Sequence, residues 1–215
     1  MARNDVSVAT YLELPDDNIE NIDWTKYPCL ETLVLGENNL REFPLIPSLT
    51  LLDLGSNNID HIPAGIHALT NLQILDLGTN KIRSVPIMTN LQRLQLGNNP
   101  ISEFDGRGMK LVELGTRHVN LTSLRLDRVA HLTVGGDAVL SGVEHVDADV
   151  LIMDRHIGGG IATLRNKPML WMPRVHTCDI RVLQKFDHIR INDLCDVTTC
   201  IDIGLPQFID LFCEK

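Results

Sequence analysis

The residues whose side chains are most suited to chemistry are cysteines and histidines near the C-terminal end of the chain. The sequence has five cysteines; Cys195 and Cys200 are separated by four residues, and Cys178 and His188 lie nearby along the chain. Zinc binds thiolates and imidazoles, but a structural site needs four of them in tetrahedral positions. A C-x4-C pair without a second close pair does not provide that set. We therefore expect buried structural thiols, with no metal and no cofactor.

Motifs for catalysis are absent from the chain. It contains no G-x-x-x-x-G-K-S/T loop for phosphates, no G-x-S-x-G for a serine nucleophile and no H-E-x-x-H for a catalytic zinc. The eight histidines are scattered, and none has a serine or cysteine in evident register. We expect that the protein is not an enzyme and that its function depends on a binding surface.

The elements that would form such a surface follow from an internal repeat. The pattern L-x-x-L-x-L-x-x-N-x-L, with Leu or Ile at its last position, starts at Leu30, Leu49, Leu72 and Leu91, so the copies are 19, 23 and 19 residues apart. In L-x-L the two leucines fall on one face of a strand, because side chains alternate. Since one copy buries too little apolar surface to fold alone, successive copies should stack as parallel strands about 4.8 Å apart.

This repeat resembles that of the leucine-rich-repeat family, over residues 30–105. The resemblance implies an α/β fold, a curved leucine-rich-repeat solenoid with a parallel β-sheet on its concave face. Short helical, 3-10 or extended segments would form the convex face. The outer segment 63–69 of the 23-residue copy has room for about one helical turn, whereas 44–48 has room only for an extended or 3-10 segment.

The asparagine at position nine of each copy is expected where the chain turns away from the strand. Its amide both donates and accepts hydrogen bonds, so it can satisfy backbone groups in the turn. Stacked copies would place these side chains in a structural ladder formed by Asn38, Asn57, Asn80 and Asn99.

We divide the chain into an N-terminal cap with a degenerate first repeat (1–29), four regular repeats (30–105), irregular or degenerate repeats (106–195) and a C-terminal cap helix (196–215). In the first repeat, Asp17 replaces the ladder asparagine. Beyond Phe104 we expect the solenoid to continue irregularly, and a separate small C-terminal domain is the alternative. Strand-like segments there are 111–119, 121–126, 129–139, 146–153 and 186–194, with interruptions at 158–160 and 168–173.

The C-terminal segment 205–212 has the spacing of an amphipathic helix. Its apolar face would consist of Leu205, Phe208, Ile209 and Phe212. We interpret this helix as a cap over the last strand edge, and a docking element is the alternative.

Side chains between the core leucines of each strand are expected to face outward on the concave side. Asp53 and Asp76 would be neighbours there, and like charges at that spacing destabilise a sheet, so a cationic group of a partner would relieve them; two solvated carboxylates are the alternative. Leu51 and Ile74 are predicted to be exposed beside them, as in an interaction patch. The predicted concave binding residues are Thr32, Val34, Glu37, Leu51, Asp53, Ser56, Ile74, Asp76, Thr79, Arg93, Gln95 and Asn98.

A column of glycines occupies position seven of the four regular copies. One interpretation is a flat strip that a partner backbone can approach closely. The other is that glycine suits the geometry of the turn. The column consists of Gly36, Gly55, Gly78 and Gly97.

Composition narrows the class of partner. The net charge is −9 and the pI is about 5.3, so the basic footprint of a nucleic-acid-binding protein is absent. No apolar run follows the N-terminal residues 1–5, so we expect no signal peptide. No stretch reaches about 18 continuous apolar residues, so we expect no membrane segment. An odd cysteine count without a secretion signal favours reduced thiols in the cytoplasm.

We interpret the chain as a protein–protein interaction module, an adaptor or an effector-like protein, whose protein partner carries a basic patch; we favour a monomer. A structural subunit of a larger complex is one alternative. An enzyme with its site in the C-terminal half is another. Cys200 and Asp202 resemble the Cys-x-Asp nucleophile motif of bacterial effectors that join leucine-rich repeats to a ubiquitin-ligase domain. That domain is much larger and helical, and this chain continues only to residue 215.

Overall fold

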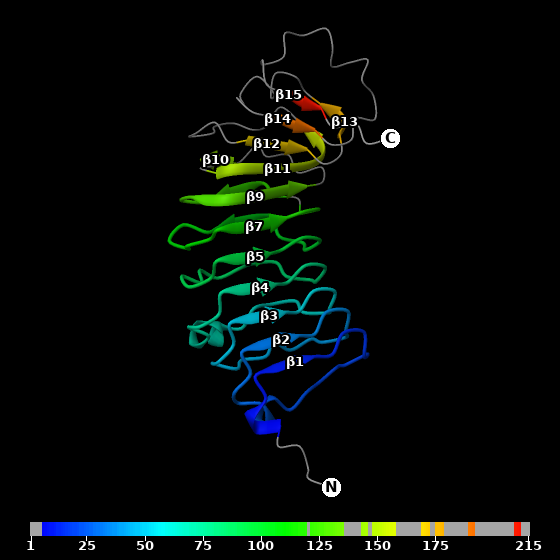
Figure 1. Ribbon diagram of the computed structural model, residues 1–215, viewed down its shortest axis with the longest axis vertical. Helices are drawn as coiled ribbons and strands as arrows, with labels where there is room; N and C mark the ends of the chain where they lie inside the picture. The colour runs from blue at the N-terminus through cyan, green and yellow to red at the C-terminus, as the bar shows by residue number, and fades with distance from the viewer. Residues whose placement is uncertain are drawn as a thin grey trace.

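Short parallel strands stacked along one axis form the main body of the computed structural model (Figure 1). The structure describes residues 6–119, 121–135, 143–145, 148–157, 169–172, 175–178, 189–191 and 209–211. The main sheet runs in the order β1 (Tyr11–Glu13), β2 (Thr32–Val34), β3 (Leu51–Asp53), β4 (Ile74–Asp76), β5 (Arg93–Gln95), β7 (Glu113–Thr116), β9 (Val129–Gly135), β11 (Ala148–Ile157), β12 (Met169–Met172), β14 (Ile189–Ile191) and β15 (Ile209–Leu211).

One turn of the solenoid, from one main-sheet strand to the next, is called a coil. A second, smaller parallel sheet lies on the returning part of the coils. Its order is β10 (Val143–His145), β8 (Ser123–Arg125) and β6 (Glu103–Asp105). One further strand, β13 (Val175–Cys178), pairs with β11. The described helices are short 3-10 turns: η1 (Val6–Val8), η2 (Trp24–Lys26) and η3 (Ala64–Ala68). The helical turn expected in the 23-residue copy is therefore η3.

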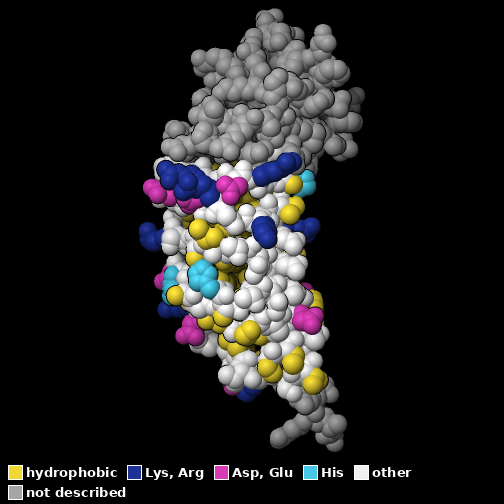
Figure 2. Space-filling view, turned by 90° about the vertical axis from the view of Figure 1, so that its left-hand side faces the viewer, with side chains coloured by type: hydrophobic (Ala, Val, Ile, Leu, Met, Phe, Trp, Pro, Cys, Tyr) yellow, Lys and Arg dark blue, Asp and Glu magenta, His cyan; other side chains and the backbone are white. Residues whose placement is uncertain are grey.

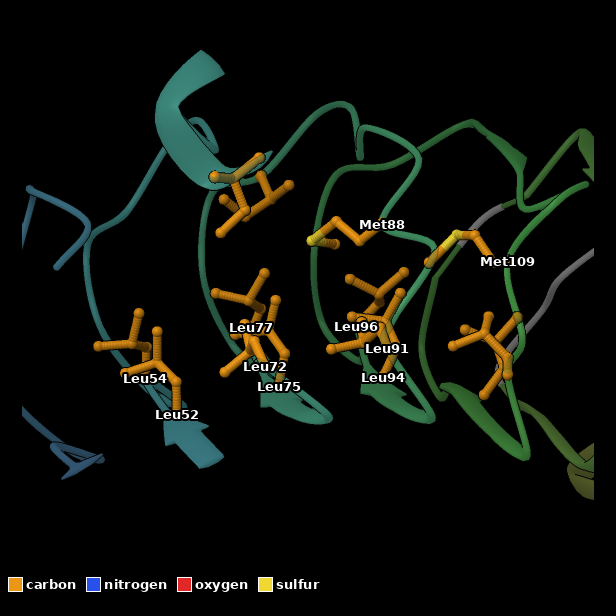
Figure 3. Close-up of a cluster of buried hydrophobic side chains, with 14 of the residues drawn as sticks. Leu52, Leu54, Leu72, Leu75, Leu77, Met88, Leu91, Leu94, Leu96 and Met109 are labelled. Atoms are coloured by element: carbon orange, nitrogen blue, oxygen red, sulfur yellow. The ribbon is translucent and has the colours of Figure 1, made fainter. Parts of the chain in front are cut away.

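The leucines of the repeat form the core between the strands and the returning segments (Figure 3). In the strand register Leu33 faces Leu52, Leu52 faces Leu75 and Leu75 faces Leu94. These four side chains are fully buried. Burial of a leucine contributes about 1.5–3 kcal/mol before conformational entropy is subtracted. One register therefore places every copy of the pattern in the same core.

The main sheet continues beyond the regular copies with nearly the same period. Leu132 pairs with Leu151, Leu151 with Leu170, and Leu170 with Ile189, at steps of 19 residues. The strands expected in 111–119, 129–139, 146–153 and 186–194 correspond to β7, β9, β11 and β14. Strand β12 lies within 168–173, where we predicted an interruption, so that prediction is wrong for residues 169–172.

The segment 121–126 contains a strand, as expected, but it does not begin another copy on the main sheet. Leu124 pairs with Phe104 in the second sheet, so β8 is the returning segment of the coil that begins at Leu111. Both sheets turn apolar side chains inward, and Leu124 is fully buried. The alternation of apolar residues is therefore the same for either sheet, and pairing with Phe104 decides between them.

The predicted C-terminal helix over 205–212 is wrong at residues 209–211. These residues form β15, which pairs in parallel with β14, and Ile209 faces Ile189. Three apolar residues in a short segment fit a helix face or a strand face equally well. Backbone hydrogen bonding to β14 selects the strand, because it extends a ladder that already exists.

Candidate functional site

The strand face consists of the side chains at positions three and five of the main-sheet strands, which point away from the core. The pairing of β1 to β5, β7 and β9 arranges them in two rows across the sheet. Row three contains Tyr11, Thr32, Leu51, Ile74, Arg93, Glu113 and His131. Row five contains Glu13, Val34, Asp53, Asp76, Gln95, Gly115 and Thr133.

Asp53 and Asp76 lie opposite each other on β3 and β4 in the middle of this face. The Gly55 N–H donates to Asp53 Oδ1 at 2.9 Å, and the Gly78 N–H donates to Asp76 Oδ1 at 2.8 Å. Burial raises the pKa of Asp76, the Gly78 N–H opposes that rise, and the charge of Asp53 adds to it. The strand face therefore holds two adjacent, half-buried carboxylates in fixed orientations.

The glycine column makes room for these carboxylates. A Cβ at Gly78 would lie 3.1 Å from Asp76 Oδ1, and a Cβ at Gly55 would lie 3.3 Å from Asp53 Oδ1. Both distances are shorter than ordinary van der Waals contact, so a larger residue would displace the acid. The column glycines do not have positive φ. Turn geometry therefore does not account for Gly55 and Gly78, and at these two positions the aspartates occupy the space beside the column.

The left-handed backbone occurs one residue later in each copy. The φ angle is 58° at Glu37, 54° at Ser56, 55° at Thr79 and 53° at Asn98, and His118 in the next coil has 56°. These side chains are exposed at the ends of their strands. The predicted position-eight residues therefore form a row beside the strand face.

Leu51 and Ile74 are adjacent in row three, but both are half-buried, so the prediction that they are exposed is correct only in part. Thr32 and Val34 on β2 are half-buried as well. The apolar part of the face is thus a shallow strip next to the acidic pair.

The acidic pair is followed by a polar network on β5 and β7. Arg93 Nε lies 3.7 Å from Glu113 Oε2, and Gln95 Nε2 donates to Glu113 Oε1 at 2.9 Å. Gly115 lets Gln95 lie across β7, because a Cβ there would lie 1.6 Å from Gln95 Oε1. Glu113 is absent from the predicted set, although the copy beginning at Leu111 places it at position three. Arg93 is thereby directed toward Glu113.

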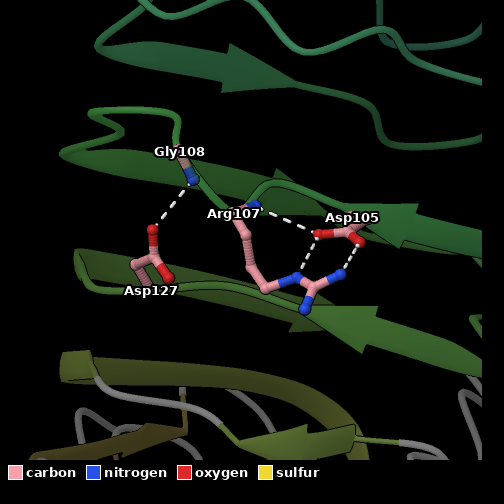
Figure 4. Close-up of polar contacts among 4 residues, drawn as sticks. All are labelled: Asp105, Arg107, Gly108 and Asp127. Carbon is pink, nitrogen blue, oxygen red and sulfur yellow. Dashed lines mark hydrogen bonds and ion pairs between the residues drawn. The ribbon is translucent and has the colours of Figure 1, made fainter.

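A separate group of charges lies at the end of the second sheet (Figure 4). Arg107 Nε donates to Asp105 Oδ1 at 2.8 Å, and the Gly108 N–H donates to Asp127 Oδ2 at 2.8 Å. The hydrogen bond from Arg107 lowers the pKa of Asp105 to about 2. Figure 2 shows acidic and basic side chains side by side at the upper end of the described surface. Such neighbouring charges largely neutralise each other.

The face shown in Figure 2 is hollowed between two neighbouring coils. The hollow has a volume of about 110 Å³ and lies between η3 and the shorter returning segment of the next coil. Its lining includes Ile66, Leu69 and Met88, and Ile87 at its edge is 47% exposed. It lies where the longer outer segment of the 23-residue copy adjoins the shorter outer segment of the next, 19-residue copy.

Among the described residues there is no group of three or more His, Cys, Asp or Glu side chains that could hold a metal ion. Cys195, Cys200 and Asp202 lie outside the described residues. Cys29, at the end of the first coil, is an exposed free thiol. In the described part of the chain, no helix is long and apolar enough to cross a membrane.

Residues 47–101 match the family model of the leucine-rich repeat. A search of curated proteins found no match. The fold is similar to a Shigella effector leucine-rich-repeat domain, with a TM-score of 0.55 and 18% identity over 96% of this chain and 83% of that chain. An internalin from Listeria monocytogenes gives a TM-score of 0.57 and 16% identity over 96% of this chain and 61% of that chain.

A third solved structure, of the LRIM1/APL1C complex, gives a TM-score of 0.51 and 19% identity, and covers 94% of this chain and 39% of that chain. The chain therefore spans less than two thirds of the length of the internalin and of this third protein. At such identities the likeness concerns the fold. Solenoids of this kind are commonly protein–protein interaction modules and are typically non-enzymatic.

Proposed function

We propose that this chain, a leucine-rich-repeat protein, is a protein-binding module whose strand face takes a basic patch of another protein at Asp53 and Asp76. The observation that carries the proposal is the pairing of these two half-buried carboxylates at one strand spacing. A Lys or Arg of the partner placed between them would replace their mutual repulsion with two favourable contacts.

The surroundings of the acidic pair support a contact of this kind. The half-buried strip of Leu51 and Ile74 lies beside it and offers apolar area to the aliphatic part of a Lys or Arg side chain. On the other side, Glu113 already pairs with Arg93. The two aspartates therefore carry the uncompensated negative charge in the middle of the face, where a partner cation gains most.

The face acts by binding, without a catalytic step, and the proposal extends to an adaptor or effector role in the cytoplasm. The odd cysteine count supports a reducing compartment, because disulfides persist in oxidising ones. Microscopy of a tagged chain in its source cell tests this part. A signal confined to the cell exterior would contradict it.

The test of the binding face is affinity capture from lysate of the source cell with the wild type, the double variant Asp53→Asn with Asp76→Asn, and a control with Glu42→Gln and Glu103→Gln. Both variants remove two negative charges. The amide oxygen of Asn keeps the hydrogen bonds from Gly55 and Gly78, so the fold is retained, and a melting curve checks this. Glu42 and Glu103 are exposed and lie outside the main sheet.

We expect a protein that the wild type and the control retain and that the aspartate variant loses. Binding should weaken as salt is raised, because the contact is ionic. A specific partner held equally by all three chains would contradict the role of the strand face. Equal loss from both variants would assign the effect to net charge alone.

A further inference from the structure

Strand β1 (Tyr11–Glu13) is the first strand of the main sheet, and it is paired on one side only among the described residues. Strand β1 pairs with β2, and among the described residues no strand pairs with its other side (Figure 1). The Thr10 carbonyl accepts from Thr32, and the Leu14 N–H donates to Val34 at 3.0 Å, so these backbone groups point toward β2. Because the direction alternates along a strand, the N–H and C=O groups of Tyr11 and Glu13 point outward.

The apolar core is also open at this end. Leu12 and Leu14 of the first coil are half-buried, whereas the equivalent Leu33 and Leu35 of the next coil are fully buried. Ile19 and Ile22, farther along the first coil, are half-buried as well. The second coil is covered by the first, and the first has no coil on its other side in the described part of the chain. One further strand would complete both the ladder and the core.

The charge of this end selects the chemistry of such a strand. Lys26 is the single basic residue among residues 6–30, and it lies 3.5 Å from Asp23. The acidic side chains of this segment are all exposed. They are Glu13, Asp16, Asp17, Glu20 and Asp23. Glu13, Asp16 and Asp17 lie in β1 or directly after it, so a strand added there would meet negative charge at one end.

We infer that β1 is a second docking edge, which takes an extended segment of a partner protein as an added β-strand with alternating apolar and basic residues. The outward groups of Tyr11 and Glu13 supply the backbone hydrogen bonds of the added strand. Its apolar side chains cover Leu12 and Leu14, and its basic side chains face Glu13 and Asp16. A second copy of this chain fits less well, because it would bring two acidic ends together.

The edge is independent of the acidic pair on the strand face. Asp53 and Asp76 lie on β3 and β4, two and three strands away from β1. A variant that removes binding at one surface should therefore leave the other unchanged. This separation lets failure of the edge and failure of the strand face be distinguished.

The experiment uses the full chain and a synthetic probe, the capped peptide Thr-Lys-Val-Arg-Val-Lys-Thr, with fluorescence anisotropy for affinity and amide hydrogen exchange for location. Two control peptides are needed: one carries Glu in place of each basic residue, and one carries N-methyl groups on alternate residues, which remove the donors of one edge. We expect the probe to slow exchange of the Tyr11 and Glu13 amides, and each control peptide to bind at least about tenfold more weakly.

Two variants of the chain locate the contact further. Tyr11→Pro removes an outward N–H and leaves the hydrogen bonds to β2 in place, and proline is tolerated on edge strands; it should weaken probe binding at least about threefold. Glu13→Lys with Asp17→Lys keeps the backbone edge, because neither position has a positive φ, and should weaken binding at least about tenfold. Asp53→Asn with Asp76→Asn should leave the probe's protection of the Tyr11 and Glu13 amides unchanged. Melting curves verify that each variant is folded.

The inference is overturned if the acidic or N-methylated peptide binds as tightly as the probe. It is also overturned if the protected amides lie elsewhere in the chain. Sedimentation of the chain alone provides the remaining check. A concentration-dependent dimer that Tyr11→Pro abolishes would identify a second copy of the chain as the occupant instead.

Discussion

The side-chain amide nitrogen of Asn57, Nδ2, lies 2.8 Å from the backbone carbonyl oxygen of Leu35 in the preceding coil. The same nitrogen donates to Leu54 within its own coil at 3.1 Å, and Asn57 Oδ1 accepts from the Leu40 N–H at 3.0 Å. Asn80 and Asn99 repeat the arrangement. One buried amide in each copy therefore satisfies backbone groups of two neighbouring coils.

Replacement of Asn57 by Leu should lower the free energy of unfolding by about 2–4 kcal/mol, because buried carbonyl and N–H groups lose their partners. Chemical denaturation followed by circular dichroism measures this. Asn58→Ala is the matched control, since its side chain bonds on the surface to Asn39 and Lys81. We expect the control to change stability by less than about 0.5 kcal/mol. Equal losses of unfolding free energy in both variants would contradict a stabilising role of the buried asparagine ladder.

Thr79 is a β-branched residue with a φ of 55°, a conformation that is unfavourable for such side chains. Thr79→Asn should raise the free energy of unfolding by about 0.5–1 kcal/mol, because asparagine tolerates the left-handed region. Thr70, exposed and without a positive φ, provides the control. A thermal melt that shows stabilisation by Thr70→Asn but not by Thr79→Asn would contradict the backbone argument.

The raised pKa of Asp76, which comes mainly from burial, predicts a pH-dependent effect of Asp76→Asn. A carboxyl whose folded-state pKa exceeds its ordinary value of 3.8 contributes stability below that value and loses it as pH rises through the folded-state pKa. Asp76→Asn should therefore raise Tm at pH 7, and the gain should disappear near pH 3.

Asp60→Asn provides the comparison for this pH effect. A hydrogen bond with His61 lowers the pKa of Asp60, so its pH dependence has the opposite sign. The Asp60 variant should give no rise in Tm at pH 7. A gain for Asp76→Asn that is equal at pH 3 and pH 7 would contradict the assignment of the effect to the carboxylate charge.

The Arg107 guanidinium predicts a measurable pKa at Asp105. Arg107→Gln should raise the pKa of Asp105 from about 2 toward its ordinary 3.8, as followed by carboxyl carbon chemical shifts in an NMR titration. In the wild type this group contributes stability above its ordinary pKa and loses it as pH falls toward about 2. Arg83→Gln, an exposed control, should leave the Asp105 titration unchanged. An unshifted Asp105 in Arg107→Gln would contradict the hydrogen bond.

Most of the regular half of the fold could be predicted because its information is local. The spacing of Leu33 and Leu35 defines a strand face within three residues, and Asn38 follows at the turn. Row neighbours such as Asp53 and Asp76 follow from aligning the copies. Glu113 was not predicted as a residue of the strand face, because its copy of the repeat lacks the ladder asparagine. The half-burial of Leu51 was not predicted, because the exposure of a side chain on a sheet depends on side chains of adjacent strands.

By itself, the sequence determined the repeat, the apolar face of each strand, the asparagine ladder and the acidic charge, since each depends on residue types at short spacing. Tertiary structure alone decided that Leu124 pairs with Phe104 in the second sheet, that 209–211 is a strand, and that β1 pairs on one side only within the described part of the chain. These outcomes depend on which backbone groups lie beside a segment. Apolar periodicity states that a side chain is buried, and contacts between distant residues determine where.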